Sequence, residues 1–329
     1  MQRLVNRSIV RVRGADRMRF LQSLLTQDVM PLDSEPLKPV ASCFLSAKGR
    51  VLCDMLLFNS SSIASNLSSL PAFSAAKPTL DDVGDAVLID HDAAISDRLV
   101  RALSMYRLKS QVQIDVLPST KYGVFALFDR NDHADNDAMG NDPRLRRLGS
   151  RYIAPTSCVA IEARENSYDQ HRLGLGVPEG FADLQWDVHT PLEANMDLLH
   201  AVSFNKGCYI GQELTARTHY TGVIRKRLFS IQIDPQSLGF IGNQGLEPTT
   251  MVGADVVRIS DDKKIGSLRS LYGHRGMALL RIEPVLTDPV PAAFGIRIPR
   301  DSRPAITIPI HRVIWPDWIP KPDLSSLES

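Results

Sequence analysis

The sequence predicts an α+β protein that ends in a small β-barrel. The chain has 329 residues, which is enough for two or three domains with buried cores. Strand-like segments and an amphipathic helix alternate between residues 87 and 128, an order typical of a ferredoxin-like α+β layer. Beyond residue 228 almost every predicted element is a strand, and such a series closes most simply into a small barrel.

The first part of the chain predicts a strand, a helix and a hairpin. Residues 8–14 alternate like a strand that ends at a glycine. Asp16 is a predicted N-cap, and apolar residues at helical spacing follow it as far as Pro31, which ends the helix. Residues 40–45 and 50–58 predict two short strands joined by a tight turn.

The middle of the chain alternates irregular and periodic segments. Residues 59–85 are rich in Ser, Pro, Ala and Asp and are expected to form an insertion or a flexible loop. A helix is predicted from Ser96, because Leu99, Leu103 and Tyr106 repeat at helical spacing. The acid-rich segment 129–137 lacks the glycine and the terminal glutamate of a calcium loop, so we expect a solvated linker. The predicted strands here are 87–90, 112–116 and 122–128.

The last part of the chain consists of predicted strands and an aromatic tail. Proline and glycine separate short alternating segments, as expected for a barrel with tight turns. The apolar tail around Trp315 and Trp318 is expected to pack back onto the protein. The predicted strands are 228–233, 255–259, 265–271, 277–282, 296–298 and 306–310.

The composition excludes some partners. Net charge is +1, so any electrostatic function must be local, and we expect neither nucleic acid nor membrane as a partner. The hydrophobic fraction of 43% and the charged fraction of 23% are ordinary for a globular protein. No apolar run approaches the length that a membrane-spanning helix needs.

The four cysteines are scattered and form no CxxC pair. This spacing argues against an autonomous zinc or iron–sulfur site, because such a site usually takes four ligands from the protein. Nor does it suggest a disulfide framework, so a reducing compartment is expected. Cys43, Cys53 and Cys158 have mostly apolar sequence neighbours and are expected to lie in the core.

The stretch 203–213 has the densest chemistry of the chain. A nearby ammonium favours a thiolate over a thiol, so Lys206 should lower the pKa of Cys208 if the two side chains lie close. Glycines on either side allow close approach of another backbone or a ligand. The alternative is that Cys208 is simply a small buried hydrophobic residue. The candidate site residues are Lys206, Gly207, Cys208, Gly211, Gln212 and Glu213.

These residues carry a family resemblance. Lys206–Glu213 resembles the KGC(F/Y)xGQE signature of the YgfZ-type family, which is related to the folate-dependent T-protein of glycine cleavage. The continuation 214–228 is similar to the eukaryotic branch of that family, the mitochondrial iron–sulfur cluster assembly factors. Residues 20–29 and 175–180 resemble further segments of the same superfamily.

The resemblance implies a three-domain arrangement on a GcvT/YgfZ-like fold. Residues 1–45 and 121–210 would form a discontinuous, folate-binding-like α+β domain. Residues 46–120 would form a ferredoxin-like insert, and 211–329 the C-terminal β-barrel domain.

The N-terminal segment allows two interpretations. The first fifteen residues contain four arginines and no acid, a composition that transit peptides share. The strand interpretation is preferred, because the family resemblance begins here. A mitochondrial matrix location is implied, with the transit peptide left out of this chain or absent.

Tetrahydrofolate is a further ligand that the resemblance implies. In the T-protein family an acid in the context of Glu193 hydrogen-bonds the pterin ring, and a carboxylate suits that task because it accepts two parallel hydrogen bonds. Asp54 is an acid in an apolar strand and must be exposed, paired or functional. Arg217 has a planar fork that suits a carboxylate, and the basic run that contains it is either a solvated face or an anion site. The folate-cavity candidates are Asp54, Glu193, Asn195 and Arg217.

Three functions remain open at this point. The first is an accessory factor that matures mitochondrial 4Fe–4S proteins and shares a transient 2Fe–2S cluster with an A-type carrier protein through Cys208. The second is a folate-dependent aminomethyl or one-carbon transferase, although the catalytic Asn-rich segment of the T-protein is not found in 87–97. The third is a folate-stabilised binding module in which Cys208 is a redox-sensitive thiol.

Overall fold

The structure is a computed structural model, and its chain divides into two compact units. Unit 1 comprises Met1–Tyr168, Trp186–Pro191 and Met196–Leu214, and unit 2 comprises Asp169–Gln185, Leu192–Asn195 and Thr215–Ser329. Most of the expected loop at 59–85 and all of the expected linker at 129–137 lie outside the described residues. The described residues are 1–61, 83–128, 140–158, 167–243, 247–288, 293–300, 303–323 and 325.

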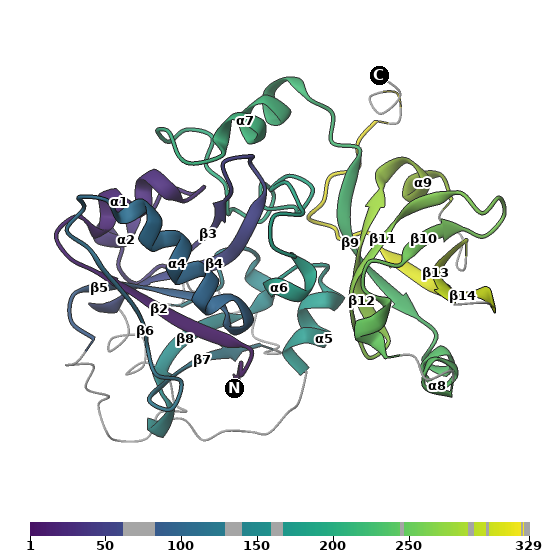
Figure 1. Cartoon of the computed structure of the whole chain (residues 1–329), viewed down its shortest axis with the longest axis horizontal. Coiled ribbons are helices and arrows are strands. Elements are labelled where there is room, and N and C mark those ends of the chain that lie inside the picture. Colours follow the sequence, from purple (N-terminus) through teal and green to yellow (C-terminus); the bar gives the residue numbers. More distant parts are fainter. Residues whose placement is uncertain are drawn as a thin grey trace. The chain divides into compact units, whose positions relative to one another are not determined.

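Unit 1 contains a five-stranded sheet in the order β3-β4-β5-β2-β6, shown in purple and blue in Figure 1. All neighbouring strands in it run antiparallel. Each residue of β4 and β5 is buried, so these central strands form the core of the sheet. The strands are β2 (Arg7–Arg13), β3 (Val40–Leu45), β4 (Val51–Asn59), β5 (Ala86–Asp92) and β6 (Gln113–Val116).

A second sheet of unit 1 has the order β1-β7-β8, with β1 at Gln2–Arg3, β7 at Tyr122–Leu127 and β8 at Ser150–Pro155. Its helices are α1 (Arg17–Leu24), α2 (Pro31–Ser34) and α4 (Ser96–Arg107). Leu99 and Leu103 of α4 are buried, whereas Tyr106 is exposed, so the predicted apolar face is two residues long rather than three.

The sheet topology differs from the expected domain boundaries. Strand β2 hydrogen-bonds to β5 and β6, and β3 pairs with β4, so strands from both sides of the expected boundary at 45/46 share one sheet. The physical reason is backbone hydrogen bonding. β2 lies between β5 and β6, and its N–H and C=O groups are satisfied by these two strands, which are distant from it in sequence. Residues 46–120 are therefore part of unit 1 together with the N-terminal strand.

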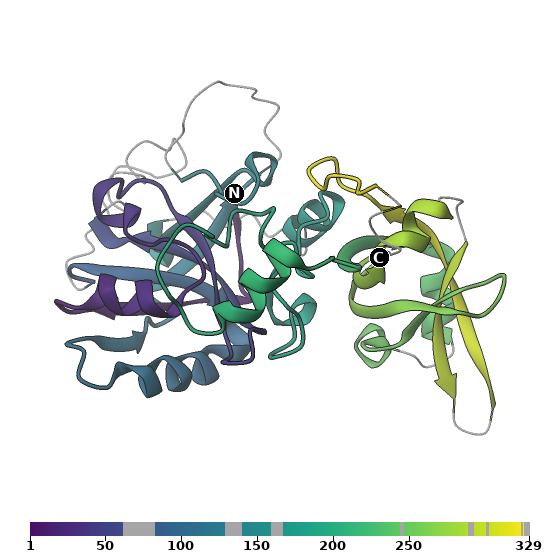
Figure 2. The same ribbon diagram turned by 90° about the horizontal axis from the view of Figure 1, so that it is seen from above.

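Unit 2 contains a closed barrel in the order β10-β11-β12-β9-β14-β13, which confirms the predicted barrel. Figure 2 shows its C-terminal strands in yellow. The helices of this unit are α5 (Ser167–Gly174, its first two residues in unit 1), α6 (Gly180–Asp183), α8 (Pro235–Asn243) and α9 (Ile282–Thr287). The barrel strands are β9 (Lys226–Ile233), β10 (Asp255–Arg258), β11 (Lys264–Tyr272), β12 (Arg275–Arg281), β13 (Phe294–Arg300) and β14 (Arg303–Ile314).

The aromatic tail packs onto unit 2 as expected. The ring centroids of Trp315 and Phe229 lie 5.0 Å apart, and the indole N–H of Trp318 donates to the Leu175 carbonyl at 2.8 Å. Among the described helices, none has the length and apolar character to cross a membrane.

Candidate functional site

The loop from Ser203 to Gly211 presents Cys208 at the surface of unit 1. Gly207 and Cys208 are exposed, whereas the next residue, Tyr209, is buried. The backbone N–H of Ser203 donates to the Thr26 carbonyl at 3.0 Å, which attaches the start of the loop to the chain after α1. The thiol therefore lies at the exposed tip of a loop whose flanks contact the protein, and the buried interpretation of Cys208 is excluded.

Lys206 anchors this loop to the end of α1. Its Nζ donates to three backbone carbonyls, those of Gln22 at 2.7 Å, Leu25 at 2.8 Å and Gln27 at 3.0 Å. An ammonium beside the free carbonyls at a helix C-terminus is favourable, because it satisfies them and complements the helix dipole. All three N–H groups of the ammonium are directed at backbone oxygens, so the predicted effect of Lys206 on the ionisation of Cys208 stays a prediction.

Burial also changes the acidity of this lysine. Partial desolvation lowers the pKa of the Lys206 ammonium to about 8, and the nearby carboxylate of Asp28 opposes that shift. The ammonium also lies 5.4 Å from the ring centroid of Tyr209, which favours the charged form as a cation–π contact. The carbonyls accept hydrogen bonds from the protonated amine, so the loop is anchored best when Lys206 is charged.

Gly211 attaches the other end of the loop to the turn between β3 and β4. It has φ +76°, and a Cβ built there would lie 2.3 Å from the carbonyl oxygen of Ser46. Gly49, at φ +77° in that turn, would place a Cβ 2.9 Å from the carbonyl oxygen of Gly211. The two glycines therefore permit a close approach of two backbones that no larger residue allows. A Cβ at Gly207 would meet nothing within 4 Å.

Gln212 and Glu213 begin helix α7 (Gln212–Thr221), which the sequence did not predict. The side-chain Oε1 of Gln212 accepts a hydrogen bond from the backbone N–H of Tyr209 at 3.1 Å. The side chain thus points back toward the residues before the helix and satisfies a backbone donor there. Glu213 is exposed in the first turn, where a negative charge complements the helix dipole. These two residues therefore have local structural roles around the loop that carries Cys208.

The other described thiols are buried in the large sheet of unit 1. Cys43 on β3 and Cys53 on β4 are almost completely inaccessible, as predicted. Burial raises the pKa of the Cys43 and Cys53 thiols, and the neighbouring Asp54 carboxylate raises both further. Neither is suited to act as a thiolate. The side chain of Cys158 lies outside the described part of the chain.

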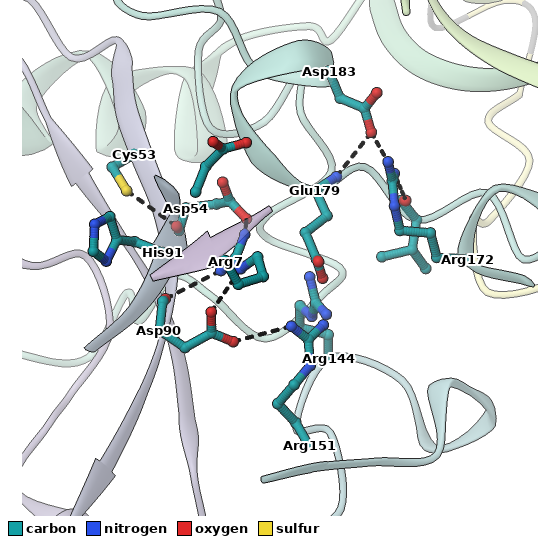
Figure 3. A network of polar contacts seen from close by, with 12 residues as sticks. Arg7, Cys53, Asp54, Asp90, His91, Arg144, Arg151, Arg172, Glu179 and Asp183 are labelled. Carbon is teal, nitrogen blue, oxygen red and sulfur yellow. Dashed lines mark hydrogen bonds and ion pairs between the residues drawn. The ribbon is translucent and has the colours of Figure 1, made fainter. Parts of the chain in front are cut away.

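Asp54 is part of a buried ionic network in unit 1 (Figure 3). It is 6% exposed, and its Oδ2 lies 3.8 Å from Nη1 of Arg7. Arg7 Nε donates to Asp90 at 2.6 Å, and Arg151 Nη1 donates to the other oxygen of Asp90 at 3.0 Å. Of the three alternatives for Asp54, the structure shows the paired one.

The network continues to Arg151 on β8 and to the segment that precedes this strand. Arg144 makes a bidentate pair with Asp142, at 3.0 and 2.7 Å, and donates to the Tyr168 hydroxyl at 3.2 Å. Arg151 also donates to that hydroxyl. The sequence offers one signal for this network. Arg7 and Ile9 are two residues apart on an alternating strand, so both side chains lie on its buried face. Figure 3 also shows Arg172 with Asp183, a buried ion pair within unit 2.

Glu193 and Asn195 lie in unit 2, beside the start of β9. Asn195 is completely buried, donates to the Leu228 carbonyl at 2.8 Å and accepts from Arg227 at 3.1 Å. Its amide therefore connects the segment before the Cys208 loop to the start of β9. Glu193 is half-buried near Arg269, and its carboxylate opposes the lowering of the Arg269 pKa by burial.

The folate-cavity candidates are divided between the two units. Asp54 belongs to unit 1, whereas Glu193, Asn195 and Arg217 belong to unit 2. Arg217 is exposed on α7, but Arg227 of the same basic run is buried, so the run is not a uniform solvated face. Their grouping around one cavity stays a prediction.

The described residues contain no group of three or more His, Cys, Asp or Glu side chains that could hold a metal ion. Cys208 is therefore not part of a set of three or more such ligands among them. A metal centre at this thiol would need ligands from outside this part of the chain.

The two sheets and the closed barrel define an α+β protein, and its fold is similar to that of an aminomethyltransferase. The crystal structure of glycine cleavage system aminomethyltransferase T from Bartonella henselae matches with a TM-score of 0.57 and 14% identity. The match covers 94% of this chain and 84% of that chain. At this identity the likeness shows the fold alone, and it confirms the predicted fold class.

Sequence comparison identifies the family. The CAF17 C-terminal β-barrel domain model matches residues 225–321. The mitochondrial iron–sulfur cluster assembly factor IBA57 of Mus musculus is 32% identical, and that of Homo sapiens 33%, each over 97% of this chain and 85% of the relative. The Dictyostelium discoideum homologue is 32% identical over 75% of this chain and 66% of its own length. The chain belongs to the IBA57 family, whose members are named as mitochondrial, in agreement with the expected matrix location.

Proposed function

We propose that this protein is an accessory factor for the maturation of mitochondrial 4Fe–4S proteins, and that Cys208 holds a transient 2Fe–2S cluster together with an A-type carrier protein. The relatives are named as iron–sulfur cluster assembly factors, which supports the general role. The observation that carries the finer proposal is the exposed thiol at the tip of an anchored loop.

Ligand number explains why a partner is needed. Each iron of a 2Fe–2S cluster takes two ligands from its surroundings, so one thiolate supplies a quarter of the usual set of about four. The other thiols described, Cys43 and Cys53, are buried and have raised pKa values. The remaining ligands would therefore come from the carrier, and the cluster would be cargo that is bound only while both proteins are in contact.

The anchoring of the loop suits a short-lived shared site. Lys206 fixes one flank through three carbonyls, and Gly211 fixes the other against the Ser46–Gly49 turn. A thiol that is already held at the surface costs less conformational entropy to engage than one on a flexible tail. The open space around Gly207 leaves room for a partner backbone.

The test is anaerobic reconstitution of the full chain with an A-type carrier, followed by visible absorption and circular dichroism of the shared cluster. We expect Cys208→Ser to abolish the spectrum of the mixed complex. Cys53→Ala is the matched control, because it removes a buried thiol, and it should keep the spectrum if the variant is folded. An unchanged cluster spectrum in Cys208→Ser would reject the ligand role.

Tetrahydrofolate is the second part of the proposal, and it depends on Glu193. Glu193 is half-buried, and a carboxylate can accept the two parallel hydrogen bonds that a pterin ring donates. Asn195 hydrogen-bonds with Leu228 and Arg227, and Asp54 pairs with Arg7. The residues thus fit the cofactor in part, and Glu193, with Arg217 for the glutamate tail, would hold it. When bound, folate would supply one-carbon chemistry.

Calorimetric titration with 5-formyltetrahydrofolate tests this part. Glu193→Gln keeps the size of the side chain but removes its charge, and we expect it to weaken binding roughly tenfold or more, since hydrogen bonds to charged groups contribute about 1.5–3 kcal/mol. Glu213→Gln, an exposed acid elsewhere, should bind as the wild type does. Equal affinity of Glu193→Gln and wild type would contradict the assignment.

A further inference from the structure

A second candidate site lies in unit 1, at the opposite end of α1 from the loop that carries Cys208. It is an open cavity of about 890 Å³ between the end of β2, the start of α1, the end of α4 and the approach to β6. Its size is within the range of small-molecule sites. Its charged lining residues are Arg13, Arg17, Asp85 and Arg107.

The charges of this cavity are unbalanced. Arg17 pairs with Asp85 at 2.9 Å and with Asp33 at 3.6 Å, so its charge is compensated. Arg13 and Arg107 form no ion pair with any described residue. Two arginines that have no ion-pair partner among the described residues therefore line the same cavity.

The Nε atom of Arg13 gives the strongest indication of a ligand in this cavity. This atom is buried and has no hydrogen-bond partner within the described structure. Leaving a buried charged donor unsatisfied is costly, and such groups in native proteins usually have a ligand, an ion or a water as partner. Because Arg13 lies on the sheet strand β2 rather than on a loop, its position is fixed by the ladders to β5 and β6.

Two backbone segments that line the cavity, at Gly14 and at Gln111, pass close to each other. Gly14, at φ +123°, would place a Cβ 2.1 Å from the carbonyl oxygen of Gln111, so only glycine permits this approach. Asp16, the residue before α1, accepts the backbone N–H of Gln111 at 2.7 Å and makes no side-chain cap to the helix. Exposed amide side chains of Gln111 and Gln113 add further donors to the wall.

We propose that this cavity binds a small anion with at least two negative charges, held by the guanidinium groups of Arg13 and Arg107. Carboxylates and phosphates share the chemistry that an arginine fork recognises, because both accept two parallel N–H bonds. The Arg17–Asp85 pair forms a neutral part of the wall. The site uses no residue of the Cys208 loop, so it goes beyond the proposed cluster function and is independent of it.

Calorimetric titration of the full chain at low ionic strength tests the proposal, with diphosphate and citrate as probes. We expect at least one probe to bind, and Arg107→Gln to weaken that binding roughly ten- to a hundredfold. Arg107 is exposed, so its substitution should leave the fold intact. Arg101→Gln, another exposed arginine of α4 outside the cavity, is the matched control and should bind as the wild type does.

The other arms of this experiment separate the outcomes. Binding of diphosphate but not citrate would assign a phosphate ligand, and the reverse a polycarboxylate. Arg13→Gln should lose binding to a similar extent if its melting temperature shows a folded protein. Cys208→Ser should bind normally, which keeps this result separate from the cluster hypothesis. Absence of binding for both probes at millimolar concentration, or equal binding by Arg107→Gln, would overturn the proposal.

Discussion

Thiols of one unit lie in opposite environments. Cys208 is exposed at the tip of a loop, while Cys43 and Cys53 are sealed inside the five-stranded sheet. Burial raises the pKa of the two inner thiols, and Asp54 adds to that effect. Residue type alone therefore does not define a reactive cysteine, because solvent access and neighbouring charge determine whether a thiolate can form.

Alkylation should show the largest contrast. We expect iodoacetamide to modify Cys208 roughly 10³-fold or more faster than Cys43 and Cys53 in the folded protein, since the buried thiols react only from rarely populated open states. Peptide mass spectrometry after timed quenching measures each rate. Denaturant should make the three rates similar. Similar rates already in native buffer would contradict the burial of Cys43 and Cys53.

Substitution of the loop glycines should have the next largest effect. Gly211→Ala puts a Cβ against the Ser46 carbonyl at a positive φ, so we expect it to lower the free energy of unfolding by about 2–4 kcal/mol. Gly207→Ala meets open space and should change stability by about 0.5 kcal/mol or less. Urea denaturation of the two variants measures the difference. Equal stability of both would show that the loop does not contact the β3–β4 turn so closely.

Acid should destabilise the five-stranded sheet of unit 1 through its buried histidine. His91 lies in β5 with its Nε2 at 2.8 Å from the Ser96 hydroxyl oxygen, and burial lowers its pKa from 6.5 to about 4. Between those values the unfolded chain binds a proton that the folded chain does not, so the free energy of unfolding falls as pH decreases from 6.5 to 4.

The matched variant for this effect is His91→Gln, which can keep a contact with Ser96. It should flatten the wild-type curve of stability against pH, by up to about 1.4 kcal/mol per pH unit. Denaturation series at several pH values measure both curves. Parallel curves for the two proteins across this window would contradict a lowered pKa.

The smallest effect is expected at the start of α7. Gln212→Ala removes the acceptor for the Tyr209 N–H and should cost about 0.5–1.5 kcal/mol in unfolding free energy. Gln212→Glu retains an acceptor oxygen and serves as the control. A loss of the same size in both variants would mean that the amide group itself, rather than its oxygen, is what the loop needs.

Local sequence patterns were sufficient for much of the fold. Alternation predicted β2 and most of the barrel strands, because a half-buried strand shows a period of two. The glycine-containing turn between two short strand-like segments predicted β3 and β4, which are almost fully buried. The periodic helix at Ser96 was also found. Helix α7 was missed, because Thr215 is its only buried residue among those described and no apolar stripe marks it.

Contacts between distant residues account for most of what the sequence did not reveal. Cys208 was found as a candidate from its glycine and lysine neighbours, but the partners of Lys206 lie about 180 residues away in the chain. The pairing of Asp54 with Arg7 and of Asp90 with Arg151 likewise depends on the strand order, which single-residue patterns do not encode. The same reason explains why the boundary expected at 45/46 falls inside one sheet.

The three hydrogen bonds from the Lys206 ammonium to backbone carbonyls have a consequence for the regulation of Cys208. Acylation of the Lys206 side chain would remove its charge and leave too few donors for the oxygens at the end of α1. The sulfur of Cys208 would remain chemically intact, but its loop would lose one of its two fixed flanks. Modification of Lys206 would thus loosen the loop that holds Cys208 at the surface, although the thiol itself would be unmodified.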